Sequence, residues 1–296
     1  MDIWNNVLSD LKKNYLRELH GYYNKQEAEQ LLTILIEHFF AITRYELILK
    51  PDYRLSESEI LVLHMAVKQL KKYKPVQYIT GMVEFHDLKF MVNEDVLIPR
   101  PETEELVQLI YNIENKNQHT ILDIGTGSGC IAISLSKLLS NPLVHATDYS
   151  KSALTIAEKN SKSNNTDVVF YNHNILDHQQ PITDETRNLI IFDIIVSNPP
   201  YVTQVDKQKM QPNVINYEPH NALFVTDDEP LEYYKAILNF AHNQLKTGGR
   251  IYFEINESLG KQMITLLKNN GYTNIELKKD ITRRDRFIYG TKSISV

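Results

Sequence analysis

Two short motifs in the sequence have residue types and spacings that could carry chemistry. The first, Asp123-Ile124-Gly125-Thr126-Gly127-Ser128-Gly129, lies between an expected strand and an expected helix, which is the setting of a cofactor loop. Glycine lets the backbone turn sharply and approach a ligand, because no Cβ is in the way. Asp148 ends the next expected strand, and an acid about 20 residues further on commonly accepts hydrogen bonds from ribose hydroxyls.

The spacing of the glycines indicates which cofactor this loop would bind. A dinucleotide loop reads Gly-x-Gly-x-x-Gly, but here Cys130 takes the place of the third glycine and Gly129 comes one position early. The loop also has no basic residue for a phosphate. These features favour S-adenosylmethionine, which carries no phosphate, over NAD. A glycine-rich turn without a ligand is the alternative interpretation.

The second motif, Asn198-Pro199-Pro200-Tyr201, follows the most apolar expected strand, and open α/β sheets bind ligands beyond the carboxyl ends of their strands. The Asn198 side-chain oxygen and the Pro199 carbonyl could accept hydrogen bonds from a planar amide or aromatic amine. Two prolines would stiffen the loop, and Tyr201 could stack on the planar group. Taken alone, the motif could equally be a strand terminator with a packed tyrosine.

This motif points to methyl transfer to a nitrogen whose lone pair is delocalised. The nitrogen would attack the sulfonium methyl in line, so placement would do most of the work. A general base is not needed to start, because the proton becomes acidic once nitrogen is alkylated. We therefore assign no base, neither Asp193 nor a histidine. The residues leave open whether the nitrogen belongs to an amide or to an aromatic amine.

The elements that position these motifs fall into two parts. Residues 1–75 carry helical apolar spacing, with a capping box at Ser56 and Glu59, and predict a helical bundle. Residues 76–97 turn extended around Gly81 and predict a linker hairpin. Residues 98–296 predict the catalytic domain. There we expect strands at 121–124, 144–148, 168–172, 190–197 and 250–255, and a closing hairpin at 272–278 and 286–291.

Helical runs between these strands predict an α/β fold with a mostly parallel, Rossmann-like sheet. Gly248 and Gly249 read as a helix stop just before the fifth strand. Residues 98–102 read as a rigid loop with two prolines, and a helix is expected to open at Thr103. Arg100, Glu102 and Thr103 are candidates to line the site, although a purely structural linker is the alternative.

Composition limits the classes of function. The chain has 296 residues, 42% hydrophobic and 23% charged, and a formal net charge of −5, which is typical of a globular protein. The negative net charge counts against a protein that binds nucleic acid directly. We therefore expect no direct nucleic-acid partner, and we expect no membrane span. One cysteine, Cys130, allows no internal disulfide, and we expect no metal. Residues 1–6 lack a signal-peptide pattern, so a cytoplasmic setting is expected.

The sequence resembles the release factor glutamine methyltransferases, the HemK/PrmC family, over nearly its full length. The matching stretches beyond the two motifs are Pro75-Val76-Gln77-Tyr78-Ile79-Thr80-Gly81, Phe85, Val96-Leu97-Ile98-Pro99-Arg100-Pro101-Glu102-Thr103-Glu104, Tyr217-Glu218-Pro219, Ala222-Leu223 and Asp285-Arg286. The order of helical front domain, hairpin and catalytic domain is also that of the family.

The resemblance implies N5-methylation of the glutamine in the Gly-Gly-Gln motif of class I peptide chain release factors, with effects on translation termination. It implies that the substrate amide is held by Asn198 and the prolines after it, and that the helical domain of residues 1–75 helps to dock the release factor. It also implies S-adenosylmethionine contacts from Gly125, Thr126, Gly127, Ser128, Gly129, Asp148, Asn174, Ile175 and Asn198. Positions 174 and 175 depart from the family pattern, in which an acid and an aromatic lie beside the adenine.

Other functions remain as alternatives at this stage. Glutamine methylation of a ribosomal protein would use the same site. N6-adenine methylation of nucleic acid would use the same amine-orienting logic on a flipped base, but it predicts a basic cleft. A non-catalytic scaffold predicts a damaged glycine loop or a broken Asn-Pro-Pro-Tyr, and both motifs are intact.

Overall fold

The computed structural model describes residues 6–177, 181–208 and 210–293. It forms two compact units, one comprising residues 1–82 with 211–217 and the other residues 83–210 with 218–296. Residues 1–5, most of the stretch that argued against a signal peptide, lie outside the described part. Among the described residues, every helix is too short or too polar to cross a membrane.

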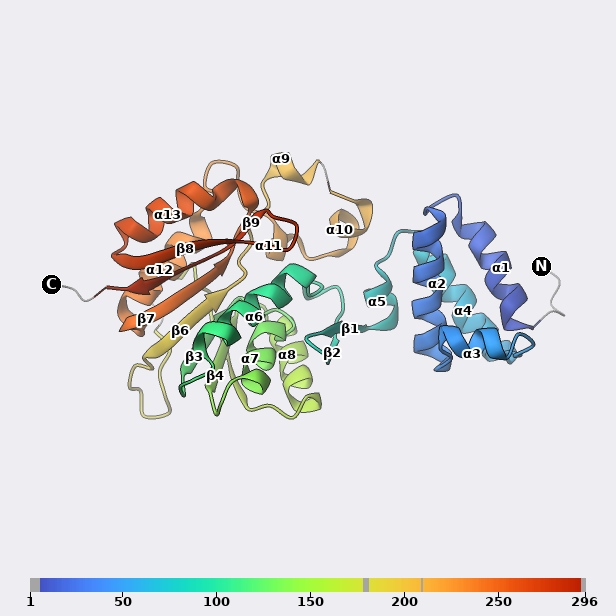
Figure 1. The fold of residues 1–296 in the computed structure, drawn as a ribbon, viewed down its shortest axis with the longest axis horizontal. Helices are drawn as coiled ribbons and strands as arrows, with labels where there is room; N and C mark the ends of the chain where they lie inside the picture. Colours follow the sequence, from blue (N-terminus) through green and yellow to red (C-terminus); the bar gives the residue numbers. More distant parts are fainter. Residues whose placement is uncertain (1–5, 178–180, 209, 294–296) are drawn as a thin grey trace. The chain divides into compact units, whose positions relative to one another are not determined.

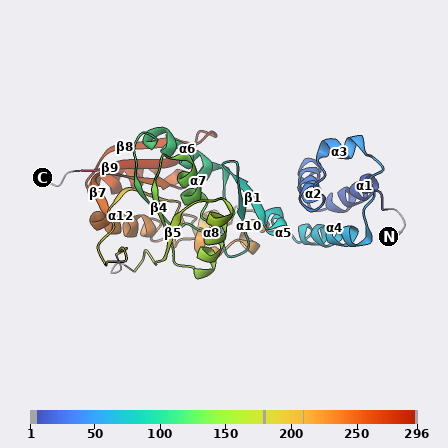
Figure 2. The ribbon, with the colours of Figure 1, turned by 90° about the horizontal axis from the view of Figure 1, so that it is seen from below.

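The first unit is helical. Apolar side chains spaced along one face of each of the three long helices pack into a single core, and Figures 1 and 2 show α1, α2 and α4 packed beside one another. The capping box expected at Ser56 and Glu59 is present at the start of α4. The elements are α1 (Leu8–Leu19), α2 (Lys25–Phe40), α3 (Arg44–Leu49), α4 (Glu57–Leu70), α5 (Val76–Thr80) and α10 (Pro212–Tyr217).

The linker differs in part from the expectation. Its first residues form the short helix α5, and Gly81 is the left-handed cap of that helix with φ 71°. The hairpin follows as β1 (Met82–Phe85) and β2 (Leu88–Met91). Its turn is His86-Asp87, where both φ angles are positive, as a tight two-residue hairpin turn requires. The side chains of Phe85 and Phe90 belong to the core of the second unit, so the hairpin is packed against that core.

The second unit is built on a seven-stranded sheet with the order β5-β4-β3-β6-β7-β9-β8. The first five strands in this order are parallel, and β9 and β8 form an antiparallel closing hairpin, as the sequence predicted. The strands are β3 (Thr120–Ile124), β4 (Leu143–Asp148), β5 (Val168–Asn172), β6 (Phe192–Ser197), β7 (Leu245–Glu254), β8 (Tyr272–Lys279) and β9 (Asp285–Lys292).

Helices cover both faces of this sheet (Figure 1). Alternate residues of β6 show why, since Ile194 and Val196 join the core under α6 and α7 while Ile195 joins the core under α12 and α13. The predicted Rossmann-like α/β fold is therefore confirmed. The remaining elements are α6 (Pro101–Glu114), α7 (Cys130–Leu138), α8 (Lys151–Ser163), α9 (Gln204–Lys207), α11 (His220–Leu223), α12 (Glu232–Gln244), η1 (Glu257–Leu259) and α13 (Gly260–Asn269).

Several element boundaries differ from those predicted, and two of the differences have a local explanation. Helix α6 begins at Pro101 rather than Thr103. Proline is tolerated at the first position of a helix, because the N–H that it lacks would have no partner within the helix there. Helix α12 ends at Gln244, and the Gly248-Gly249 pair lies inside β7 instead of before it. A register shift between β6 and β7 accommodates the extra residues, and Gly248 has the positive φ (80°) that such a bulge favours.

Candidate active site

The register of the sheet brings the two sequence motifs to one edge. Ile124 pairs with Thr147 on one side and with Ser197 on the other, and Ser197 pairs with Phe253. The next residue of each strand or loop therefore lies in one row across the carboxyl edge of the sheet, and this row is Gly125, Asp148, Asn198 and Glu254. The strand order reverses between β3 and β6, the place where open α/β sheets bind ligands.

The glycine loop takes a backbone shape that side chains resist. Gly125, Gly127 and Gly129 all have positive φ, at 75°, 56° and 84°. The backbone N–H groups of Gly125 and Thr126 both donate to the Thr147 carbonyl at 2.9 Å. These bonds fix the loop to the end of β4 and leave its other face toward the edge of the sheet.

Gly129 is the least replaceable of these glycines. A Cβ there would meet Ile133 Cδ1 at 2.8 Å and Ala157 Cβ at 3.3 Å, and its φ adds about 1–2 kcal/mol of backbone strain. We predict that Gly129→Ala lowers the free energy of unfolding by about 2 kcal/mol or more in urea titrations. Gly21→Ala is the control, because a Cβ there has nothing within 4 Å. Equal stability of the two variants would contradict this packing argument.

Asp148 is tied to the loop through both carboxylate oxygens. Oδ2 accepts from the Gly127 N–H and Oδ1 from the Ser150 N–H, each at 2.9 Å. Burial raises the pKa of Asp148, and these N–H groups act against the rise. Each carboxylate oxygen has a second lone pair, so Asp148 can still accept a hydrogen bond from a ligand.

Asp123, the first residue of the loop motif, is fully buried. Burial raises its pKa to about 7, and the hydrogen bond from Thr126 Oγ1, at 2.6 Å, opposes this rise. Asp123 is not among the residues that line the cavity described below. Its observed role is to hold the loop through Thr126.

The raised pKa of Asp123 has a consequence for stability. The folded chain holds this proton up to about pH 7, whereas the unfolded chain loses it near pH 4. Stability therefore falls as pH rises between these values, by on the order of 4 kcal/mol. We predict that Asp123→Asn flattens this slope in urea unfolding from pH 5 to 8. Asp184→Asn, at an exposed aspartate whose pKa is lowered, should leave the slope unchanged. An unchanged slope in Asp123→Asn would refute the assignment.

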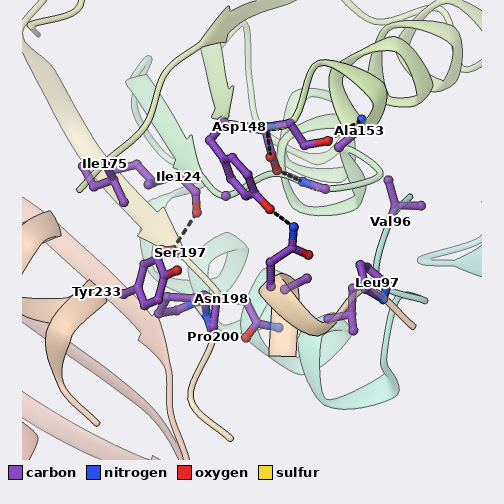
Figure 3. A pocket seen from close by; sticks show the side chains of 18 of the residues that line it. Val96, Leu97, Ile124, Asp148, Ala153, Ile175, Ser197, Asn198, Pro200 and Tyr233 are labelled. Carbon is purple, nitrogen blue, oxygen red and sulfur yellow. Dashed lines mark hydrogen bonds between the residues drawn. The ribbon is translucent and has the colours of Figure 1, made fainter. Parts of the chain in front are cut away.

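A cavity of about 450 Å³ opens at this edge, within the size range of small-molecule sites. Figure 3 shows Asp148 and Asn198 facing the same hollow, with Ile175 and Tyr233 on one side and Val96 and Leu97 on the other. Of the residues proposed from sequence, those that line it are Gly125, Gly127, Asp148, Asn174, Ile175, Asn198, Pro199 and Pro200. Thr126, Ser128 and Gly129 shape the loop without lining the cavity.

Sequence reasoning missed several lining residues, among them Leu97, Tyr149, Asn221, Ala222, Tyr233 and Ile237. Leu97 and Ala222 lie in stretches that carried the family resemblance, and that was the available signal. Asn221 Nδ2 donates to the Tyr149 hydroxyl, and this bond joins α11 to the loop between β4 and α8. Asn160 was also missed. It is fully buried and bonds both Met91 of the hairpin and the Ser128 carbonyl of the glycine loop.

Asn198 follows directly after β6, whose last residue is fixed by a 2.6 Å bond from Ser197 Oγ to the Ile124 carbonyl. Asn198 Nδ2 donates to Thr103 Oγ1 at 3.1 Å. Its side-chain oxygen has no hydrogen-bond donor among the described residues, and Asn198 lines the cavity. The amide oxygen is thus available to a ligand, as the proposed chemistry requires.

Tyr201 is placed differently from its three neighbours in the motif. Its hydroxyl donates to Glu254 Oε1 at 2.9 Å, and its ring packs against the core beneath the site. It is not among the residues that line the cavity. Burial and the nearby Glu254 carboxylate raise the pKa of Tyr201 well above its usual value, so the hydroxyl keeps its proton. Stacking of Tyr201 on a substrate stays a prediction.

The three candidates in the 98–103 segment have separate surroundings. Arg100 pairs with buried Glu218 at 2.5 Å, and the other oxygen of Glu218 accepts from the Ile98 N–H at 3.4 Å. Thr103 is buried and contacts Asn198. Glu102 lies in the first turn of α6. None of these three lines the cavity, so their expected role at the site stays a prediction, and Thr103 reaches the cavity only through Asn198.

Comparison with known proteins places the chain in a family. Residues 106–223 match the Methyltransferase small domain and residues 14–81 match the PrmC N-terminal domain. A release factor glutamine methyltransferase of Flavobacterium psychrophilum is 43% identical, over 95% of this chain and 98% of that protein. The chain belongs to the release factor glutamine methyltransferases. A second member, from Bacteroides thetaiotaomicron, is 40% identical over 93% of this chain and 96% of that protein.

A solved structure supports the fold of this family member. A putative SAM-dependent methyltransferase from Streptococcus mutans has a TM-score of 0.50 and 11% identity, and covers 71% of this chain and 55% of that chain. At this identity the likeness concerns the fold alone. The Methyltransferase small domain match spans the glycine loop, Asp148 and the Asn-Pro-Pro-Tyr motif, so the cavity lies in the methyltransferase part of the chain.

Proposed function

We propose that this chain transfers a methyl group from S-adenosyl-L-methionine to the side-chain amide nitrogen of the glutamine in the Gly-Gly-Gln motif of class I release factors. The observation that carries the proposal is that Asn198 lines the cavity and that its amide oxygen has no donor from the described chain, since Thr103 takes up the NH₂ end. Asn198 lies in the same row as the glycine loop and Asp148. The names of the relatives, release factor glutamine methyltransferases, support a glutamine of a release factor as the substrate.

The residues of the cavity fit the proposed cofactor. Its ribose hydroxyls are suited to the acceptors of Asp148, and the flat, apolar face of an adenine suits Ile175 with Asn174 beside it. The open backbone of Gly125 and Gly127 allows close approach. When bound, S-adenosyl-L-methionine supplies an electrophilic methyl on a positively charged sulfur.

The chain's own residues orient the acceptor nitrogen. Asn198 Oδ1 and the Pro199 carbonyl accept the two N–H groups of the glutamine amide, which holds its nitrogen toward the methyl group. Pro199 and Pro200 have no N–H that would compete for these acceptors. The N–C bond forms as the S–C bond breaks, and one amide proton then leaves to water. Partial positive charge develops on nitrogen, and both carbonyl oxygens stabilise it.

The remaining assignments belong to the same proposal. The helical unit, residues 1–82 with 211–217, would help to dock the release factor, in line with the match of residues 14–81 to the PrmC N-terminal domain. A cytoplasmic location follows from a release factor substrate. Neither a nucleic acid nor a membrane is a partner in this scheme. The alternatives, a ribosomal-protein glutamine or an adenine base, find no support in the names of these relatives.

A substrate panel tests the proposal. The protein is incubated with labelled S-adenosyl-L-methionine and, separately, a release factor, its Gln→Ala variant in the Gly-Gly-Gln motif, ribosomal protein, or DNA. We expect label on the unaltered release factor alone. Equal label on the Gln→Ala variant, or label on DNA or ribosomal protein instead, would overturn the assignment.

A further inference from the structure

Glu254 is a buried carboxylate directly beside the proposed acceptor site, and the proposed transfer does not use it. It ends β7 and is 1% exposed. Thr103 Oγ1 donates to its Oε2 at 2.7 Å, and the Tyr201 hydroxyl donates to its Oε1 at 2.9 Å. An ionised carboxylate only accepts hydrogen bonds. Both hydroxyl protons therefore point at Glu254.

This arrangement determines what Thr103 can offer to Asn198. A threonine hydroxyl has one proton, and that proton is committed to Glu254. The lone pairs of Thr103 Oγ1 remain, and they can only accept. The group that lies 3.1 Å away must then be the NH₂ of Asn198. Because the amide is planar, its oxygen faces away from Thr103.

We propose that Thr103 and Glu254 are positioning residues that set which end of the Asn198 amide faces the substrate. The inference rests on the proposed function, in which Asn198 Oδ1 accepts a substrate N–H. An asparagine turned by 180° has nearly the same shape, but it would present NH₂ to that N–H and place two donors face to face. Glu254, Thr103 and Asn198 thus form a directional chain of hydrogen bonds that excludes the turned amide.

Glu254 acts as the acceptor in both of its side-chain hydrogen bonds, from Thr103 and from Tyr201. Burial raises the pKa of Glu254, whereas these two bonds and the charge of Arg286 on β9 act against the rise. Arg286 is itself held by Asp280 at 3.3 Å and by the Ile255 carbonyl at 3.3 Å. The Tyr234 hydroxyl of α12 donates to the backbone carbonyl of Glu254 at 2.9 Å. Hydrogen bonds from Thr103 of α6 and from Tyr201 thus hold the carboxylate, and the bond from Tyr234 of α12 holds the backbone of Glu254.

Three variants of Thr103 and one control test the chain of bonds. Thr103→Val keeps the side-chain shape and removes the hydroxyl, and Thr103→Ser restores the hydroxyl. We expect Thr103→Val to lower kcat roughly tenfold, the effect of losing one orienting hydrogen bond, with little change in the KM for S-adenosyl-L-methionine. Thr103→Ser should retain most of kcat. The methyl group of Thr103→Val that replaces the hydroxyl lies against the Glu254 carboxylate and could prevent folding. In that case Thr103→Ala, which lacks this methyl group, replaces it, and we expect the same loss of kcat.

The control is Ser134→Ala, because the buried Ser134 hydroxyl has no hydrogen-bond partner in the described part of the chain. It should keep full activity. A double variant gives the sharper comparison. In the Asn198→Ala background, Thr103→Val should cause no further loss of kcat, because Thr103 acts through Asn198. A full, additive loss in that background, or equal losses in Thr103→Val and Thr103→Ser, would overturn the proposal.

A second measurement does not depend on activity. Solvent exchange of the Asn198 side-chain NH₂ protons, followed by NMR on ¹⁵N-labelled protein, should be slow in the unaltered chain and in Thr103→Ser. It should be at least several-fold faster in Thr103→Val or Thr103→Ala. Equal exchange in all of them would show that Thr103 does not hold the amide. If the unaltered chain fails to methylate a release factor, the proposed function fails, while this exchange measurement still decides the hydrogen-bond chain.

Discussion

Asn198→Ala is expected to lower kcat for release factor methylation by about 100- to 1000-fold, the usual effect of removing one preorganised group that stabilises developing charge. The glutamine amide then loses the acceptor that holds its nitrogen. The affinity for S-adenosyl-L-methionine should change by no more than a few-fold, because Gly125, Gly127 and Asp148 are untouched. Single-turnover kinetics and calorimetric titration of the cofactor measure the two quantities separately.

Two further variants sharpen this prediction. Asn198→Asp keeps acceptor oxygens but has no NH₂ to donate to Thr103. Because the Thr103 hydroxyl already donates its proton to Glu254, the new carboxylate would face an oxygen that can only accept. It should therefore not rescue kcat. Asn112→Ala, at an exposed position on α6, is the control and should behave as the unaltered chain. If Asn198→Ala instead kept turnover and lost cofactor affinity, the role given to Asn198 would be wrong.

Asp148→Ala is expected to weaken S-adenosyl-L-methionine binding by roughly 10- to 100-fold, since hydrogen bonds to a charged group contribute about 1.5–3 kcal/mol. The variant removes the acceptor for ribose and leaves the Gly127 and Ser150 N–H groups without their partner. At saturating cofactor, kcat should remain within a few-fold of the unaltered value. Equilibrium dialysis with labelled cofactor measures the affinity.

Asp148→Asn separates the two effects of this residue. Its one amide oxygen can still accept a hydrogen bond, so its affinity should lie between those of Asp148→Ala and the unaltered chain. The control is Asp177→Ala. Asp177 follows β5, but it does not line the cavity. An Asp148→Ala chain with normal cofactor affinity would show that the ribose lies elsewhere.

Much of the catalytic unit could be predicted from the sequence because local pattern and tertiary structure agree there. Ile194, Ile195 and Val196 form an apolar run, and a strand covered on both faces requires such a run. The glycine loop was predictable because its positive φ angles limit the residue choice. Both motifs were expected at the carboxyl ends of strands, and in a parallel sheet those ends lie at one edge.

The rest depended on contacts between distant residues. The residue type of Glu254 says nothing about its partners, and Thr103 lies 151 positions away in the chain. The short helix α5 was missed because Val76–Thr80 contains β-branched and aromatic residues that read as extended. No local sequence pattern marks residues 211–217 as part of the helical unit. They are joined to it by contacts with residues far away in the chain, such as the hydrogen bond from the Tyr217 hydroxyl to the Lys72 carbonyl.

Tandem mass spectrometry of a release factor treated with this protein and S-adenosyl-L-methionine tests the central claim most directly. The account predicts one added methyl group on the side-chain nitrogen of the glutamine in the Gly-Gly-Gln motif, and its loss when the Asn198→Ala protein is used. A methyl group on any other residue, or an unmodified glutamine after full incubation with cofactor, would contradict the account.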